Sequence, residues 1–187
     1  MRHIPFLVTQ PYPANASEEQ LLTGCLAQER AAQFQLYQRY KAAMFACALR
    51  ILHDRDLAHD ALQEAFVKVF RQLATFRQEA TLGAWIRTIV VRQALQLLRQ
   101  ESQMEVYDPL RHAEPLVAWH DSLTGEALDK AIGELPAGYR TVFCLIEVEG
   151  YTHREVAELL GISEGTSKSQ LYRAKQQLQV KLYHLYP

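Results

Sequence analysis

Apolar residues recur along most of the chain at spacings of three and four, which predicts an all-α fold. Helices with one buried face are expected over residues 29–53, from Asp54 or Asp56 to about Leu73, and from Thr81 to about residue 100. The sequence contains no convincing strand alternation or hairpin signal. The first expectation is therefore a protein built from packed helices.

Two short segments mark helix starts particularly clearly. Ser17-Glu18-Glu19-Gln20 and Thr152-His153-Arg154-Glu155 are capping boxes, in which the first and fourth side chains satisfy each other's backbone N–H groups. Between them the helical period fades over residues 101–122, where two prolines and scattered acids stand. We expect two small helical domains joined by a flexible acidic linker. The predicted parts are a loose arm at 1–16, a four-helix domain at 17–100, the linker at 101–122 and a helix-turn-helix domain at 123–187.

The segment after Thr152 has the pattern of a helix-turn-helix. Gly161 allows the left-handed residue of a sharp turn, and Ser163 is placed to cap the next helix. On that second helix Ser167, Leu171, Ala174 and Leu178 share one face, while short hydroxyls and an arginine lie opposite. Such side chains suit base edges in a DNA major groove, although face polarity alone would fit an ordinary solvated helix equally well.

Composition leaves the fold class unchanged but adds a charge pattern. The chain has 187 residues, 49% apolar and 22% charged, with a formal net charge of −1, so a uniformly basic nucleic-acid coat is excluded. Residues 66–100 carry six basic residues and one acid, residues 101–135 carry eight acids and two basic residues, and residues 163–187 carry four basic residues and one acid. Two basic blocks separated by an acidic one suit a polyanionic partner.

The C-terminal pattern closely resembles the promoter-reading domain of extracytoplasmic-function (ECF) sigma factors of bacterial RNA polymerase. The resemblance lies in the segment LPAGYRTVFCLIEVEGYTHREVAELLGISEGTSKSQLYRAKQQL. It implies recognition of the −35 promoter element and docking on the polymerase flap. Two positions depart from the commonest form: Ser167 stands at a usually aliphatic core position, and Gln170 where arginine is frequent. The implied −35 contacts are Thr166, Lys168, Ser169, Gln170, Arg173 and Lys175.

Many transcription regulators share a helix-turn-helix, so a second feature is needed to choose among them. That feature is an acidic ridge on the helix after Asp54. Its residues would suit an ordinary solvated face, yet their spacing also resembles the family's polymerase-binding helix. In that family the ridge docks on the clamp coiled coil of the large catalytic subunit. The implied core-polymerase contacts are Asp56, Asp60, Gln63 and Glu64.

The next segment, FRQEATLGAWIRTIVVRQALQLLRQ, resembles the family's −10 reader. A loop would hold a flipped base, and the following helix would place cations beside the non-template strand. Trp85 is interpreted as a core residue rather than a stacking platform. Arg92 and Gln96 replace the commoner Asn and Asp and make the strip more basic. The implied −10 contacts are Arg77, Gln78, Glu79, Thr81, Arg87, Arg92 and Arg99.

The function predicted from these resemblances is a dissociable sigma factor that binds core RNA polymerase and recognises the −10 and −35 elements. Its implied partners are core polymerase, promoter DNA and an inhibitory anti-sigma factor. We expect no catalysis by the chain, no metal, no cofactor, no signal peptide, no membrane span and a cytoplasmic location. Two alternatives stay open: a helix-turn-helix regulator that acts without polymerase, and a nucleic-acid enzyme with a metal or nucleotide requirement.

Overall fold

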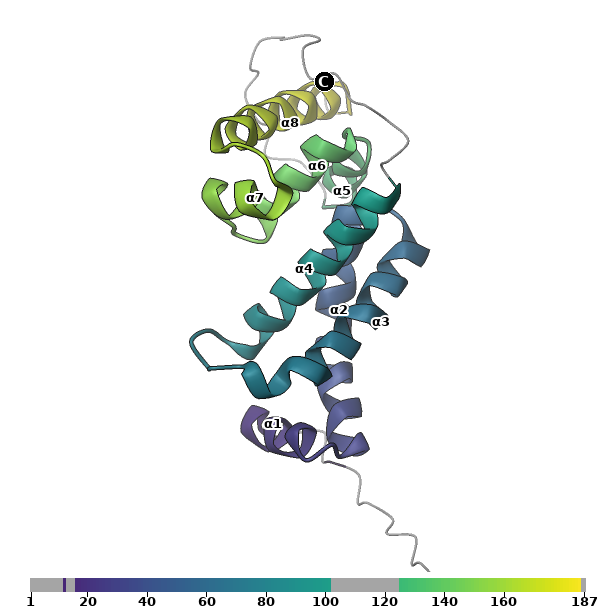
Figure 1. Ribbon diagram of the computed structural model, residues 1–187. Helices are drawn as coiled ribbons and strands as arrows, with labels where there is room; N and C mark the ends of the chain where they lie inside the picture. The colour runs from purple at the N-terminus through teal and green to yellow at the C-terminus, as the bar shows by residue number, and fades with distance from the viewer. Residues whose placement is uncertain (1–11, 13–15, 102–124, 186–187) are drawn as a thin grey trace, which may run out of the picture.

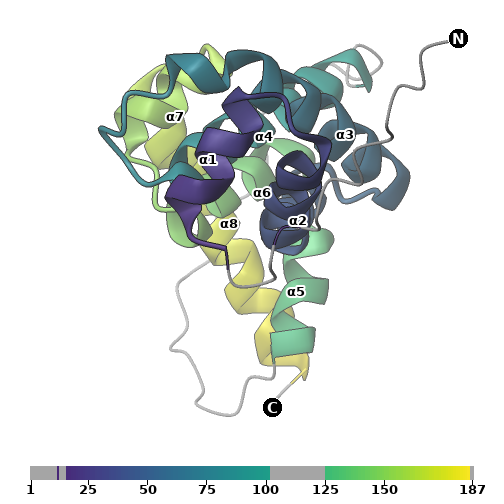
Figure 2. The same ribbon diagram turned by 90° about the horizontal axis from the view of Figure 1, so that it is seen from below.

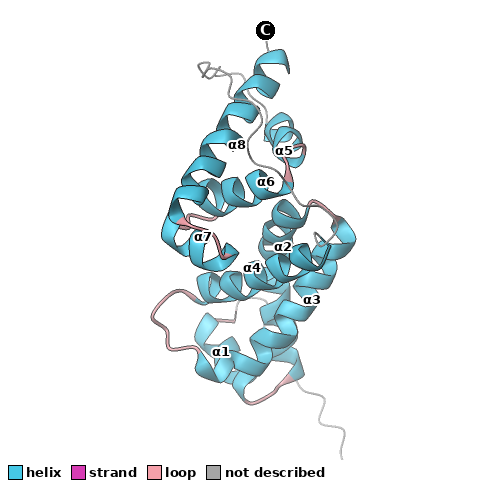
Figure 3. Ribbon diagram, turned by 45° about the horizontal axis from the view of Figure 1, so that its top comes forward, coloured by secondary structure: helices cyan, strands magenta, loops and turns pink. Residues whose placement is uncertain are grey.

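The described part of the computed structural model is helical and contains no strand, which confirms the all-α prediction (Figures 1 and 3). The structure describes Tyr12, residues 16–101 and residues 125–185. The predicted arm and linker therefore lie almost entirely outside the described residues. Helices α1 to α4 form one group and helices α5 to α8 a second (Figure 1).

The first group follows the predicted stripes closely. Its elements are α1 (Glu18–Leu26), α2 (Arg30–Leu52), α3 (Arg55–Gln72), the 3-10 turn η1 (Leu73–Thr75) and α4 (Leu82–Glu101). Helix α1 packs across one end of the group, against α2 and η1 (Figure 2). Helices α2, α3 and α4 pack against one another over their lengths and bury the apolar faces that the sequence predicted.

Side-chain caps begin these helices where the sequence placed them. Ser17 and Gln20 exchange both hydrogen bonds of the capping box, at 3.1 and 2.9 Å. Of the two candidates before α3, Asp54 is the cap, because its carboxylate accepts the N–H groups of Asp56 and Leu57 at 2.8 and 2.9 Å. Thr81 accepts from the N–H of Ala84 at 3.2 Å. Each cap satisfies N–H groups that a helix start leaves unpaired.

The second group consists of α5 (Gly125–Gly133), α6 (Ala137–Phe143), the π-helical turn η3 (Cys144–Val148), α7 (His153–Leu160) and α8 (Glu164–Leu185). The buried side chain of Arg140 donates to the carbonyls of Gly133 and Leu135, at 3.2 and 3.0 Å, and so satisfies the end of α5. The residue pattern gave no sign of the widened turn η3. It ends just before Glu149.

Helices α7 and α8 form the predicted helix-turn-helix. The capping box at Thr152 is present, and its backbone and side-chain hydrogen bonds hold the pKa of Glu155 below its ordinary value. Gly161 has φ of 70°, a left-handed conformation that costs glycine little. Ser163 accepts the N–H of Thr166 at 3.0 Å and begins α8. The corner is therefore fixed by bonds between residues close in sequence.

Ser167, the departure from the aliphatic pattern, is fully buried between the two helices. Its hydroxyl lies 2.9 Å from Nδ1 of His153 on α7, so it is hydrogen-bonded. Leu171, Ala174 and Leu178 continue the same buried face along α8, as predicted. The polar position thus serves as a specific link between α7 and α8.

We expect Ser167→Ala to lower the free energy of unfolding by about 1 kcal/mol, because the mutation leaves the ring nitrogen of His153 without this partner. Ser169→Ala is the matched control, since the Ser169 hydroxyl bonds only to the carbonyl of Thr166 in its own helix. Both changes raise helix propensity equally. Urea unfolding followed by circular dichroism measures the difference, and equal stabilities would show that the bond between the helices contributes nothing.

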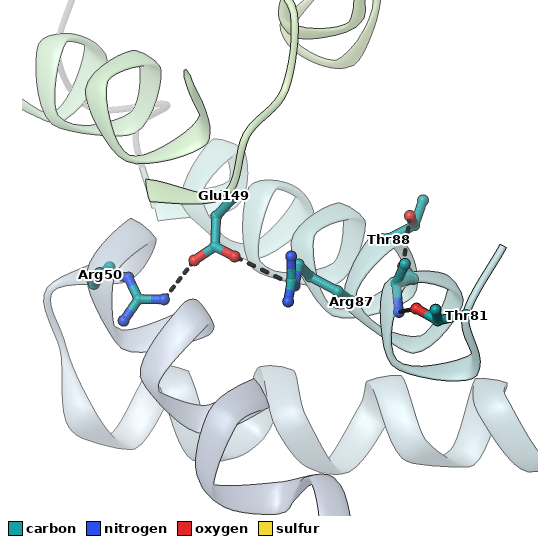
Figure 4. A network of polar contacts seen from close by, with 6 residues as sticks. Arg50, Thr81, Arg87, Thr88 and Glu149 are labelled. Carbon is teal, nitrogen blue, oxygen red and sulfur yellow. Dashed lines mark hydrogen bonds and ion pairs between the residues drawn. The ribbon is translucent and has the colours of Figure 1, made fainter. Parts of the chain in front are cut away.

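The two groups also touch directly, since α2 contacts α6. The sequence predicted only a tether between the domains. This contact brings side chains of α2 and α4 against the turn between η3 and α7, as Figure 4 shows. The arrangement of the predicted binding surfaces depends on it.

Candidate nucleic-acid and polymerase interfaces

The face of α8 away from the core carries the predicted −35 residues. Lys168 and Ser169 are exposed, and Thr166 and Arg173 are half-buried. Thr166 and Ser169 already use their hydroxyls locally, with Ser163 and with the Thr166 carbonyl. A hydroxyl can still accept a further bond, so both stay suited to a groove.

Two of the predicted −35 residues lie against other parts of the C-terminal group. Lys175 pairs with Glu147 at 2.8 Å. The amide of Gln170 lies beside Gly138 of α6, and its buried Oε1 atom has no hydrogen-bond partner within the described part of the chain. Lys168 and Arg173 are therefore the long cationic side chains of this face that form no hydrogen bond or ion pair with the described residues.

The predicted −10 loop between η1 and α4 is exposed. Arg77, Gln78 and Glu79 are exposed, and Gln78 has φ of 60°, which non-glycine residues seldom adopt. Phe76 and Trp85 close the base of the loop, with ring centroids 5.4 Å apart. Trp85 is half-buried and packs against the core, in line with its interpretation as a core residue.

The three arginines predicted on α4 differ in their surroundings. Arg92 is exposed to solvent. Arg87 forms an ion pair with Glu149, at 3.4 Å between Nε and Oε2, and Arg99 donates to the carbonyl of Leu159 at the end of α7. The C-terminal group thus contacts two of the three.

The acidic ridge lies on the exposed face of α3. Asp56, Asp60, Gln63 and Glu64 are all exposed. Of the two cap candidates, Asp54 caps α3. The side chain of Asp56 is therefore not used as a cap and belongs to the ridge. Four polar side chains on one face provide a negatively charged surface for a basic partner.

An apolar groove lies beside the ridge, and the residue pattern had not predicted it. It has a volume of about 290 Å³ and runs between α2 and α3, lined by Tyr37, His59, Leu62, Gln63, Phe66, Val67 and Phe70. Val67 is 38% exposed and Phe34 on α2 is 58% exposed. The sequence did contain a signal for this groove. Val67 follows Gln63 by one helical turn, which places an apolar side chain on the polar side of α3. An apolar groove next to a charged rim is typical of a protein-binding surface.

The second unanticipated feature is a buried carboxylate between the two groups. Glu149 follows η3, and its side chain is 5% exposed. Arg50 of α2 contacts it at 2.5 Å, and Arg87 of α4 contacts its other oxygen (Figure 4). Neither Arg50 nor Glu149 stands out in the sequence, since each lies in an otherwise regular segment.

The thiols and hydroxyls around this carboxylate belong to both groups. Burial, the Glu149 carboxylate and a hydrogen bond to it raise the pKa of Cys47 to about 12. Burial raises the pKa of the Tyr151 hydroxyl above its ordinary value. Cys144 lies with its sulfur 3.7 Å from the carbonyl of Arg50. The contact is therefore a mixed polar and apolar interface.

Among the described residues, no group of three His, Cys, Asp or Glu side chains is placed to hold a metal ion. His59, which the sequence brought close to several acids, packs on the ring of Phe45 with centroids 4.4 Å apart. No helix formed by the described residues is long and apolar enough to cross a membrane.

Comparison with known proteins identifies both groups. The family profile described as Sigma-70 region 2 matches residues 36–103, and the profile described as Sigma-70, region 4 matches residues 125–178. The ECF RNA polymerase sigma factor SigM of Mycobacterium tuberculosis is 30% identical over 163 residues, which cover 87% of this chain and 83% of SigM. The chain belongs to the ECF sigma factors of bacterial RNA polymerase.

Two other known proteins are similar to this sigma factor and support the same family. SigE of Mycolicibacterium smegmatis is 29% identical over 152 residues, which span 77% of the chain and 59% of SigE. The structure of the sigma factor RpoE in complex with the anti-sigma factor NepR from Bartonella quintana aligns with a TM-score of 0.54 and 26% identity, over 80% of this chain and 95% of RpoE. Sigma factors bind core polymerase and direct transcription initiation at promoters, and the chain carries both family regions.

Proposed function

We propose that this sigma factor reads its promoter with two separate surfaces and holds core polymerase with a third. The outer face of α8 contacts the −35 duplex through Thr166, Lys168, Ser169, Gln170, Arg173 and Lys175. The loop at residues 77–81 and the arginines of α4 hold the melted −10 strand. The ridge of Asp56, Asp60, Gln63 and Glu64 docks on the polymerase clamp.

The observation that carries the proposal is the pairing of the exposed ridge with the apolar groove on α3, on a different helix from both DNA surfaces. Acidic rim charges steer encounter with a basic partner, and the groove supplies apolar contact area. DNA binding by either domain alone is then weak, and tethering on polymerase raises the effective concentration.

Transcription with purified core RNA polymerase tests the proposal. The full chain is added to core enzyme on a library of genomic DNA fragments, and transcript starts are mapped by sequencing, with core enzyme alone as control. We expect new start sites that share two sequence elements centred near −10 and −35. Sequence-specific DNA binding without any polymerase-dependent start would instead support a regulator that acts independently of polymerase.

The remaining properties in this proposal follow from the family. The chain itself catalyses no reaction, since nucleotide addition belongs to polymerase. It acts in the cytoplasm, where core polymerase and promoter DNA are found. An anti-sigma factor holds it inactive, as suggested by the relationship to RpoE, whose structure contains the anti-sigma factor NepR.

A further inference from the structure

We propose that the free sigma factor is held in a closed state by Glu149, which binds Arg50 and Arg87 of the N-terminal domain and masks part of the −10 surface. The proposal rests on the proposed function, because it takes Arg87 and Arg99 as contacts for the −10 strand. The closed state must open before both promoter elements can be bound together.

The geometry supports a specific contact between the two domains. We call this contact, formed by Glu149, Arg50 and Arg87, the Glu149 clasp. The π-helical turn η3 ends at Val148, and Gly150 has φ of 79°, so the chain turns sharply around Glu149. One carboxylate oxygen receives Arg50 from α2 and the other receives Arg87 from α4, so a single side chain joins three elements. A buried carboxylate depends strongly on such partners.

Two further contacts close the same interface. Arg99, three turns along α4 from Arg87, donates to the carbonyl of Leu159 at the end of α7. Tyr151, two residues beyond Glu149, is half-buried and packs against the core. The C-terminal domain therefore contacts α4 at Arg87 and again at Arg99, and both arginines are among the predicted −10 contacts.

The closed arrangement cannot span a promoter. Because Arg99 contacts Leu159 just before α8 begins, the −35 helix starts within one length of α4, about 30 Å, from the −10 surface. The −10 and −35 elements are separated by about 25 base pairs, or about 85 Å of duplex at ~3.4 Å per base pair. Binding both elements requires the domains to part.

The clasp also has the incomplete bonding expected of a contact that opens. The Nε atom of Arg50 is buried and has no hydrogen-bond partner among the described residues. Arg87 meets the carboxylate through a longer contact, and its side chain is 41% exposed. A phosphate of the DNA strand can therefore reach Arg87 and compete with Glu149 for it. Polymerase, which docks the two domains separately, adds a second bias toward the open state.

Thiol reactivity in the intact chain measures opening. Cys144 is fully buried with its sulfur against the carbonyl of Arg50 in the other domain, whereas Cys25 is buried between α1 and α2 within the N-terminal domain. Labelling by N-ethylmaleimide, read site by site by mass spectrometry, compares the two cysteines in one molecule. Opening accelerates Cys144 but not Cys25, while unfolding of the N-terminal domain accelerates Cys25 as well.

Glu149→Gln is the test variant and Glu147→Gln its matched control, because Glu147 pairs with Lys175 inside the C-terminal domain and carries the same charge. We expect labelling of Cys144 relative to Cys25 to rise about fivefold in Glu149→Gln and to stay unchanged in Glu147→Gln. Arg50→Gln removes the clasp from the other side and is expected to match Glu149→Gln. Equal labelling of Cys144 in the test and control variants would overturn the closed state.

Binding of a short fluorescein-labelled single-stranded DNA, followed by anisotropy without polymerase, tests the masking. Glu149→Gln is expected to bind about three- to tenfold more tightly than Glu147→Gln. The slope of log K against log salt should steepen by about 0.7 for each newly contacted phosphate. Faster labelling of Cys144 without tighter binding would overturn the masking. A wild-type chain that fails to start transcription with core enzyme would overturn the proposed function, and that result is independent of the labelling.

Discussion

Replacing Glu64 by lysine is expected to weaken binding to core RNA polymerase by about 2 kcal/mol, or ~30-fold. Glu64 is exposed at the end of the acidic ridge and belongs to the same helix face as Gln63, which lines the apolar groove. A lysine there would face the basic partner that the ridge is proposed to contact. Like charges opposed across an interface cost several kcal/mol, and they also slow the encounter.

Competition with an unlabelled wild-type chain for core polymerase measures this loss. Glu19→Lys on α1 is the control, because Glu19 is also exposed and lies outside the groove between α2 and α3. This substitution changes the net charge by the same amount as Glu64→Lys. Far-ultraviolet circular dichroism should be unchanged in both variants, since neither residue is buried. If Glu64→Lys competes as well as Glu19→Lys, the ridge has no part in docking.

Replacing Arg173 by alanine is expected to lower −35-dependent transcription about 5- to 150-fold, equivalent to about 1–3 kcal/mol. The side chain is half-buried on the outer face of α8, opposite the buried face formed by Leu171 and Ala174. An arginine in a major groove can bond two acceptors of one guanine, and alanine removes both bonds. The loss should be largest at promoters with the preferred base at that position.

Lys168→Ala separates base reading from backbone contact. Lys168 is exposed near the start of α8, and a lysine on a phosphate reads no sequence. We expect Lys168→Ala to weaken all promoters by a similar factor and to lower the salt slope, while Arg173→Ala changes the ranking of promoters. Transcript-start sequencing on the same fragment library gives both results. An unaltered promoter ranking in Arg173→Ala would make Arg173 an ordinary surface residue.

Within one helix or turn, the residue pattern predicted most of the structure, and the π-helical turn η3 is the exception. The capping boxes at Ser17 and Thr152, the cap at Thr81 and the left-handed Gly161 are all present. The fold class, the family and the faces of α8 were predicted for the same reason. Caps and amphipathic faces depend on residues three or four positions apart, and that spacing is visible in any sequence. The roles assigned to individual DNA-binding and polymerase-binding residues stay predictions.

Contacts between distant segments were decided by the tertiary structure alone. Glu149 meets Arg50 and Arg87 across 99 and 62 positions of chain, and Val67 becomes part of a groove only when α2 lies beside α3. Such contacts depend on which surfaces remain uncovered once each helix group has packed, and no local pattern records that. The sequence by itself determined two helical sigma-factor domains and their outward-facing residues. Only the assembled structure decided that the domains meet, because the burial of one carboxylate between two arginines is a property of the joined surfaces.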